Sequence, residues 1–140
     1  MIKQVSFEQY QDEIVSMMLD MTHLEPQEVQ IPVARYIELD DMGILKPFLW
    51  FDAGMVKGVA LLFVSPSLRN LTIVDASTDV LWVKPEHRGN SQVFMDGIKC
   101  LLKEMGVNYW MVSSRDSHPI DDFLIKNDFD PLERVFYCEV

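Results

Sequence analysis

The order of the elements along this 140-residue chain predicts an α/β (α+β) fold, with one domain over residues 1–140 and a central mixed, mostly antiparallel, twisted sheet flanked by helices. Three observations lead to this prediction. Two segments with helical spacing open the chain, two β-rich runs joined by a short turn follow, and a parallel βαβ unit is expected at residues 79–114. The expected order is α, α, β, β, β, α, β, α, β.

Two N-terminal helices are expected, the first at residues 7–21 and the second from Pro32 onward. Ser6 and Gln9 have the spacing of a capping box, and apolar residues recur after them at helical intervals. Pro32 can start the second helix, and Gly43 marks its end.

A hairpin and a third strand are expected next. The runs KPFLWFDAG and VKGVALLFVS are rich in strand-forming residues, and a turn around Asp52-Ala53-Gly54 joins them. The run LTIVDASTDVLWV, residues 71–83, alternates over its second half. That alternation predicts that one face of the strand is shared by Asp75, Ser77, Asp79, Leu81 and Val83.

The rest of the chain predicts a crossover and a closing strand. A loop at 84–91, an amphipathic helix at 92–105 and a buried strand at 107–114 follow one another, and the right-handed crossover makes the two strands parallel. A short helix from Ser117-His118-Pro119 to about residue 127 and a closing strand, ERVFYCEV, complete the fold.

Charge and composition exclude several classes of partner. Twenty-two acidic and 12 basic residues give a net charge of -10, which repels phosphodiester backbones, so no nucleic-acid partner is expected. A cationic acceptor or a basic protein would fit this charge, although an acidic surface is most often only a solvated one. The sequence has no apolar signal segment and no uncharged run of membrane-spanning length, so a cytoplasmic protein without a membrane partner is expected.

The two cysteines, Cys100 and Cys138, are far apart in the sequence. They are expected to be buried small apolar residues rather than a disulfide, and no metal site is predicted.

The stretch VKPEHRGNSQV, residues 83–93, has the pattern of an anion site. Free amides at the start of the following helix, together with Arg88, would attract a phosphate. A lone basic turn before a helix is also often only a connection, so the residues alone leave both interpretations open.

The sequence around this stretch carries a family resemblance. LWVKPEHRGNSQVFMDGIKCLLKEMGV resembles the acetyl-coenzyme A (acetyl-CoA) motif of the GNAT superfamily of N-acetyltransferases, in which a strand ending V-x-P precedes an Arg/Gln-x-x-Gly-x-Gly/Ala loop and a helix. FLIKNDFDPLERVFYCEV is similar to the family's closing helix and strand, and FDAGMVKGVALLFVSPS to its hairpin. The likeness covers residues 45–140 and is nearest to small GNAT-like proteins of bacterial and bacteriophage genomes.

The resemblance implies a position for acetyl-CoA as co-substrate. Backbone groups of Leu81, Trp82 and Val83 would meet the pantetheine arm. The pyrophosphate loop would consist of Arg88, Gly89, Asn90, Ser91, Gln92 and Val93.

Two departures from the family pattern bear on activity. Ser91 and Val93 stand where the motif has small residues, and a valine is expected to crowd an anion that needs close backbone approach. Leu124 falls in the slot of a tyrosine that protonates the leaving thiolate, and leucine cannot donate a proton. His118 is a candidate replacement acid, although a histidine beside a proline at a helix start is more often a cap or a surface residue.

A general base is needed because an ammonium group must lose a proton before it attacks a thioester. Asp75 and Asp79 lie on the strand where several family members place an acidic base, and Glu25 lies where acceptor pockets are often built. For either aspartate, a solvated position at a strand edge or turn is the alternative interpretation.

Three functions follow from these expectations. The first is acetyl transfer from acetyl-CoA to a primary amine of a small molecule or protein by direct attack, because neither cysteine has a neighbouring histidine to suggest a covalent intermediate. The second is a catalytically impaired GNAT-fold protein that binds or inhibits a basic protein, and it could be phage-encoded. The third is a homo-oligomeric accessory that uses its final strand, and a homodimer is also one assembly that the resemblance suggests.

Overall fold

The structure is a computed structural model that describes residues 1–140. It contains one five-stranded sheet in the order β1-β2-β3-β4-β5. The first four strands pair antiparallel, and β5 pairs parallel to β4. This arrangement confirms the predicted mixed, mostly antiparallel sheet with a parallel βαβ unit. The strands are β1 (Ile2–Gln4), β2 (Leu45–Asp52), β3 (Met55–Ser67), β4 (Asn70–Val83) and β5 (Tyr109–Met111).

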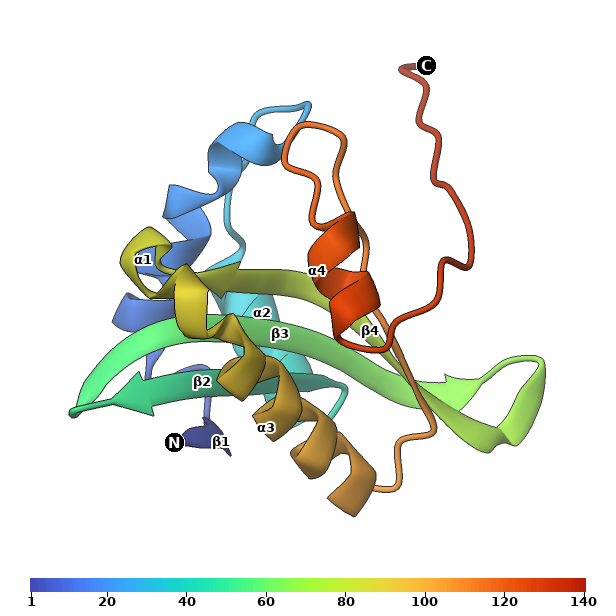
Figure 1. The fold of residues 1–140 in the computed structure, drawn as a ribbon, viewed down its shortest axis with the longest axis horizontal. Helices are drawn as coiled ribbons and strands as arrows, with labels where there is room; N and C mark the ends of the chain where they lie inside the picture. The colour runs from blue at the N-terminus through green and yellow to red at the C-terminus, as the bar shows by residue number, and fades with distance from the viewer.

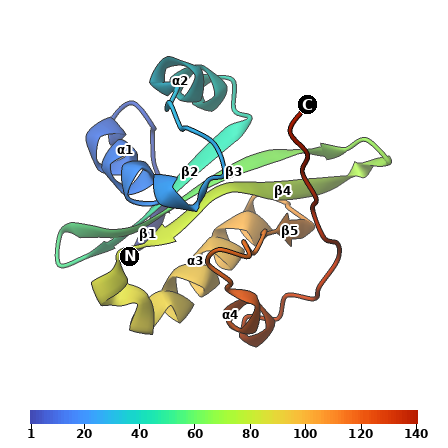
Figure 2. The same cartoon turned by 90° about the horizontal axis from the view of Figure 1, so that it is seen from above.

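Helices cover both faces of the sheet, with α1 and α2 on one face and α3 and α4 on the other (Figures 1 and 2). The helical elements are α1 (Gln11–Asp20), η1 (Thr22–Leu24), α2 (Val33–Asp41), η2 (Pro85–Asn90), α3 (Ser91–Glu104) and α4 (Asp121–Lys126). No helix is both long enough and apolar enough to span a membrane.

The core consists of two apolar clusters, one on each face of the sheet. Ile14 and Met17 of α1 pack on the first face against Leu49 of β2 and Leu61 of β3. On the second face the cluster consists of Phe48, Trp50, Ala60, Leu62, Ala76, Phe94, Ile98 and Leu102. Successive residues of β3 alternate between the two clusters, as a strand buried on both faces requires.

A β-bulge in β4 corrects the predicted strand face. Leu61 of β3 faces Val80 and the next residue faces Thr78, which leaves Asp79 without a partner in the ladder. Ala76 before the bulge packs on the α3 face, whereas Val80 after it packs on the α1 face. The five residues predicted to share a face therefore divide between both faces, because one extra residue reverses the alternation.

The hairpin and the second helix are confirmed. Ala53 and Gly54 have φ values of 50° and 75°, which the tight turn between β2 and β3 requires. Pro32 is the N-cap of α2, and Gly43 follows its end with a φ of 74°. The first helix begins four residues later than predicted, at Gln11, because residues 7–10 form turns; the Gln9 amide still donates to Ser6 Oγ at 3.4 Å.

The closing strand was predicted wrongly. Residues 127–140 form no strand, and the tail extends from α4 away from the sheet (Figure 1). Val135, Phe136 and Tyr137 are exposed. The segment has high β propensity, but a strand forms only against a partner ladder, and β5 offers three residues.

Some smaller predictions also need correction, and one strand is new. The strand predicted as buried over 107–114 is the short, half-exposed β5, and β1 was not predicted at all. The predicted loop after β4 is the 3-10 helix η2. Cys100 and Cys138 are both exposed rather than buried.

Candidate functional site

The C-terminal half of β4 forms one wall of a cleft of about 470 Å³. Its other walls come from the end of η1, the start of α3, and the segment between β5 and α4. The lining residues are Met21, Leu24, Thr78, Asp79, Leu81, Trp82, Val83, Arg88, Ser91, Phe94, Met95, Val112, Ser113, Arg115, His118, Ile120 and Phe123. The cleft is therefore apolar along its length and carries charged groups at separate points.

Arg88 lies at the end of the cleft where β4 passes into η2. Its Nε donates to the Val83 carbonyl at 3.0 Å, and its guanidinium carbon lies 4.5 Å from the centroid of the Trp82 ring. Ser91 is 7% exposed, and its Oγ donates to the Arg88 carbonyl at 2.8 Å. The Arg88 side chain, near the start of α3, thus rests on the strand that was predicted to hold pantetheine.

The other residues of the predicted pyrophosphate loop lie outside the cleft lining. Gly89, Asn90 and Gln92 are exposed, and Gln92 Nε2 donates to Asp96 at 2.9 Å. Val93 is 53% exposed, so its side chain does not fill the cleft as the sequence suggested. The Ser91 amide already bonds to the Arg88 carbonyl, so the start of α3 presents fewer free amides than an open loop would.

Trp82 is central to the cleft wall. It is 7% exposed, and its ring centroid lies 6.2 Å from that of His118 and 6.5 Å from that of His23. Its Nε1 is buried without a hydrogen-bond partner in the chain. Trp110, by contrast, donates from Nε1 to Thr78 Oγ1 at 2.9 Å.

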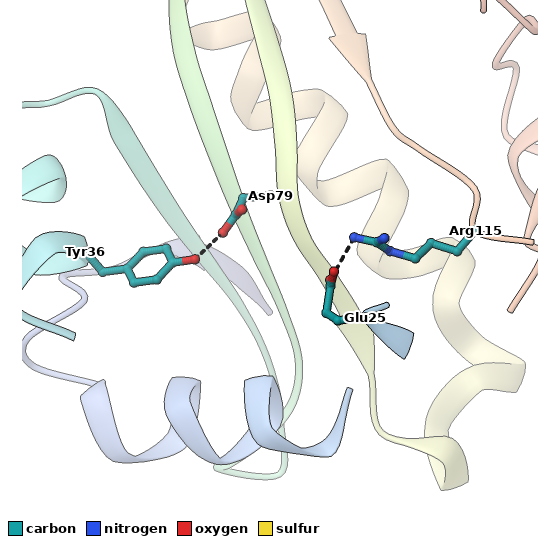
Figure 3. A network of polar contacts seen from close by, with 4 residues as sticks. All are labelled: Glu25, Tyr36, Asp79 and Arg115. Atoms are coloured by element: carbon teal, nitrogen blue, oxygen red, sulfur yellow. Dashed lines mark hydrogen bonds and ion pairs between the residues drawn. The ribbon is translucent and has the colours of Figure 1, made fainter. Parts of the chain in front are cut away.

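Asp79 is held by a tyrosine that the sequence analysis did not identify. The Tyr36 hydroxyl, on α2, donates to Asp79 Oδ2 at 2.6 Å, and the two side chains point toward each other (Figure 3). Burial and then the nearby Asp79 carboxylate raise the pKa of Tyr36 well above its usual value of 10.0, so its phenol stays protonated. The bulge in β4 therefore places the exposed Asp79 carboxylate at the cleft. The hydrogen bond from Tyr36 holds one of its oxygens in place.

Glu25 forms an ion pair with Arg115, which lines the cleft. Arg115 Nη2 lies 2.7 Å from Glu25 Oε1 and joins the segment after η1 to the segment after β5 (Figure 3). Arg115 lines the cleft, whereas Glu25 does not contribute to its lining. Asp75 also lies outside the cleft, in the sheet opposite Ser65 and Tyr109.

The structure thus brings seven of the sequence-derived candidates together: Asp79, Leu81, Trp82, Val83, Arg88, Ser91 and His118. Sequence reasoning missed Tyr36 and Arg115. Their partners are 43 and 90 residues away in the chain, and no local spacing signals such contacts.

Leu124 is 8% exposed on α4 and is not part of the cleft lining, whereas the adjacent Phe123 is. This position therefore supplies no proton donor to the cleft. No group of three or more His, Cys, Asp or Glu side chains has an arrangement that could hold a metal ion.

A second hollow, of about 540 Å³, lies near β1 and the end of α2. It is more polar and contains none of the candidate site residues. Its lining consists of Lys3, Gln4, Val5, Ser6, Gln9, Tyr10, Asp40 and Asp41.

Comparison with known proteins shows the fold but no close relative. No protein-family model matches the chain, and no curated protein matches it in sequence. Among solved structures, an aminoglycoside acetyltransferase from an uncultured soil metagenomic sample, in complex with sisomicin, superposes with a TM-score of 0.77 at 12% identity, covering 100% of this chain and 94% of that one. A predicted acetyltransferase with acetyl-CoA from Clostridium acetobutylicum gives a TM-score of 0.73 at 14% identity, covering 99% and 95%.

A ribosomal-protein-alanine N-acetyltransferase from Brucella melitensis biovar Abortus gives a TM-score of 0.72 at 13% identity, covering 100% of this chain and 99% of that one. The similarity to these structures extends over the whole chain. It therefore includes the central sheet, the parallel βαβ unit and the flanking helices. The chain therefore has the fold of the GNAT-type N-acetyltransferases.

Proposed function

We propose that the chain is an acetyl-CoA-dependent N-acetyltransferase that passes the acetyl group directly to a primary amine. The observation that carries this proposal is the single cleft that runs along β4, with Arg88 and Ser91 at one end and the exposed Asp79 carboxylate at its bulge. A basic group for an anion and an acidic group for an ammonium thus share one apolar channel. Acyl transfer from coenzyme A to an amine needs the two reactants held together and an acceptor for the proton of the amine.

The cleft residues suggest where acetyl-CoA would be held. Arg88 would leave the Val83 carbonyl and pair with the pyrophosphate, and that carbonyl would then accept from a pantetheine amide. The side chains of Leu81, Phe94 and Phe123 offer apolar contact to the arm. The family resemblance implies the same roles for Arg88 and for the strand.

The acetyl transfer itself needs two proton movements. Asp79 would take a proton from the acceptor ammonium, directly or through water, while Tyr36 keeps the carboxylate in place. The amine nitrogen then attacks the thioester carbonyl, the C–N bond forms, and the C–S bond breaks to release the thiolate. The nitrogen gives up its second proton, which would pass to the thiolate through His118 or water, because Leu124 has no proton to give.

The solved structures support this proposal as similar folds with known ligands. The Clostridium protein contains acetyl-CoA, and the metagenomic protein contains sisomicin, an aminoglycoside. A cationic acceptor also suits a chain of net charge -10.

The test is acetyl-CoA affinity in Arg88→Glu, with Arg69→Glu as the matched control. Both arginines are exposed, but Arg69 lies in the turn between β3 and β4, outside the cleft. Loss of one charge-assisted contact predicts an affinity about 10 to 100 times weaker for Arg88→Glu, measured by titration calorimetry. Arg69→Glu should bind as the wild type does, and equal affinities in all three proteins would contradict the proposal.

A binding or inhibitory function is the second candidate, because the buried Leu124 leaves no tyrosine acid in the closing helix. It predicts acetyl-CoA binding without transfer. An assay of free thiol release with a panel of primary amines separates the two functions. Binding with no release above hydrolysis would favour the second.

A further inference from the structure

Trp82 carries a hydrogen-bond donor for which the fold provides no acceptor. The residue is 7% exposed and lines the cleft, and its Nε1 has no partner. An indole N–H can only donate, and buried polar groups in folded proteins are nearly always paired, so an unpaired donor in a binding cleft needs an explanation. The Trp110 N–H, which is satisfied by Thr78, shows that this fold can pair an indole when its role is structural.

The side of the sheet on which Trp82 lies indicates what it meets. After the bulge, Val80 and Trp82 pack with the α1 cluster, whereas Leu81 and Val83 pack with the α3 cluster. The pyrophosphate end of the proposed acetyl-CoA site belongs to the α3 side, at Ser91. The Trp82 side chain packs in the α1 cluster, against which Tyr36, the hydrogen-bond partner of Asp79, also packs.

We propose that the Trp82 N–H recognises the acceptor substrate, by donating to an oxygen that lies close to the reacting amine. This inference rests on the proposed function and names a substrate class within it: primary amines with a neighbouring hydroxyl, ether or carbonyl oxygen, such as amino sugars, amino alcohols and amino-acid amides. Asp79 supplies the negative charge for the ammonium group, and the Trp82 and His118 rings, whose centroids are 6.2 Å apart, line the same cleft. A simple hydrocarbon amine would satisfy Asp79 but leave the N–H unpaired.

Arg88 links this recognition to acetyl-CoA. The Nε1 atom is closed to solvent, and the guanidinium carbon of the exposed Arg88 lies over the Trp82 ring, 4.5 Å from its centroid. When Arg88 turns toward a pyrophosphate, the ring loses this cover. Pairing of Arg88 with a pyrophosphate would therefore uncover the ring, and an Arg88→Ala substitution should uncover it without acetyl-CoA.

The experiment follows the indole N–H signals of ¹⁵N-tryptophan-labelled protein by NMR. The signal of Trp82 is assigned as the one missing in Trp82→Phe. The wild type saturated with coenzyme A, and separately Arg88→Ala alone, are titrated with two probes, glucosamine and cyclohexylamine. Both are primary amines on six-membered rings, but only glucosamine carries oxygens.

The expected result is a downfield shift of the Trp82 signal with glucosamine and not with cyclohexylamine. The affinity for glucosamine should fall about tenfold in Trp82→Phe, while Trp50→Phe, the same change in the sheet core outside the cleft, should leave it unaltered. An unmoved Trp82 signal in both titrations would overturn the proposal.

Two further outcomes separate this inference from the proposed function. A shift caused by acetyl-CoA alone, and unchanged by either amine, would assign the donor to the thioester carbonyl and overturn the acceptor role. If coenzyme A fails to bind the wild type, the proposed function fails, but the Arg88→Ala titration still decides whether Trp82 recognises an oxygen-bearing amine.

Discussion

The hydrogen bond between Tyr36 and Asp79 makes a prediction that combines stability with pH. Tyr36→Phe removes the hydroxyl and keeps the ring, whose centroid lies 5.2 Å from that of Phe7 with an interplanar angle of 4°. The substitution therefore deletes the 2.6 Å contact to Asp79 and leaves the stack in place. At pH 8 we expect the free energy of unfolding to fall by about 1 to 2 kcal/mol. This value is at the low end of the range for hydrogen bonds to charged groups, because the exposed Asp79 carboxylate is hydrated by water in the variant.

The dependence on alkaline pH has a definite sign. Burial and Asp79 raise the pKa of Tyr36 in the folded state above its usual value of 10.0. The folded protein then binds the phenol proton more tightly than the unfolded chain, so this stabilisation is complete below pH 10 and is lost as the pH rises above it. The advantage of the wild type over Tyr36→Phe should shrink by at most about 1.4 kcal/mol per pH unit, less after solvent screening of a half-buried group.

Urea unfolding of both proteins at pH 8, 10 and 11 measures this difference. The comparison of two proteins cancels the titration of the lysines and of the other tyrosines. Equal stability at pH 8, or a difference that persists unchanged at pH 11, would refute the assigned hydrogen bond.

Three other changes test the packing around the cleft. Gly58→Ala should cost about 1 to 3 kcal/mol, because a Cβ there would lie 3.0 Å from the Phe94 ring and 3.1 Å from the Trp82 carbonyl, whereas Gly89→Ala meets nothing within 4 Å; equal urea midpoints would contradict this. Phe94→Ala should cost about 3 to 5 kcal/mol, since the ring is fully buried and stacks on another aromatic ring at 5.9 Å; a loss below 1 kcal/mol would mean that the cluster is not close-packed. Deleting residues 133–140 should change the free energy of unfolding by less than about 0.5 kcal/mol, because these side chains are exposed; a large loss would show that the tail pairs with the sheet.

Local sequence patterns were sufficient to predict most of the fold. The turn at Ala53-Gly54 and the crossover from β4 through α3 to β5 follow from turn chemistry and hydrophobic periodicity. The closing strand failed because propensity describes a segment, whereas a strand also needs a free ladder beside it. The predicted face of β4 was wrong for a similar reason. The extra residue at Asp79 can be recognised only from the register of β4 against β3.

The candidate site was predicted along β4 and η2 but not across the cleft. Trp82 and Arg88 are near each other in sequence, and both line the cleft. Tyr36 and Arg115 belong to other elements, and their contacts arise from the packing of α2 and of the β5–α4 segment around the sheet. The buried, unpaired N–H of Trp82 also had no sequence signal, because the family resemblance implied a binding role only for the backbone of this residue.

The thermal unfolding midpoint of the protein, measured with increasing acetyl-CoA, tests most directly whether the β4 cleft binds this ligand. A ligand that binds only the folded state at 100 times its dissociation constant stabilises by about 2.7 kcal/mol, which for a chain of this size raises the midpoint by about 8 °C. We expect such a concentration-dependent rise, and we expect Arg88→Glu to weaken it while Arg69→Glu does not. A midpoint that stays constant up to millimolar acetyl-CoA would contradict the assignment of the β4 cleft as the acetyl-CoA site.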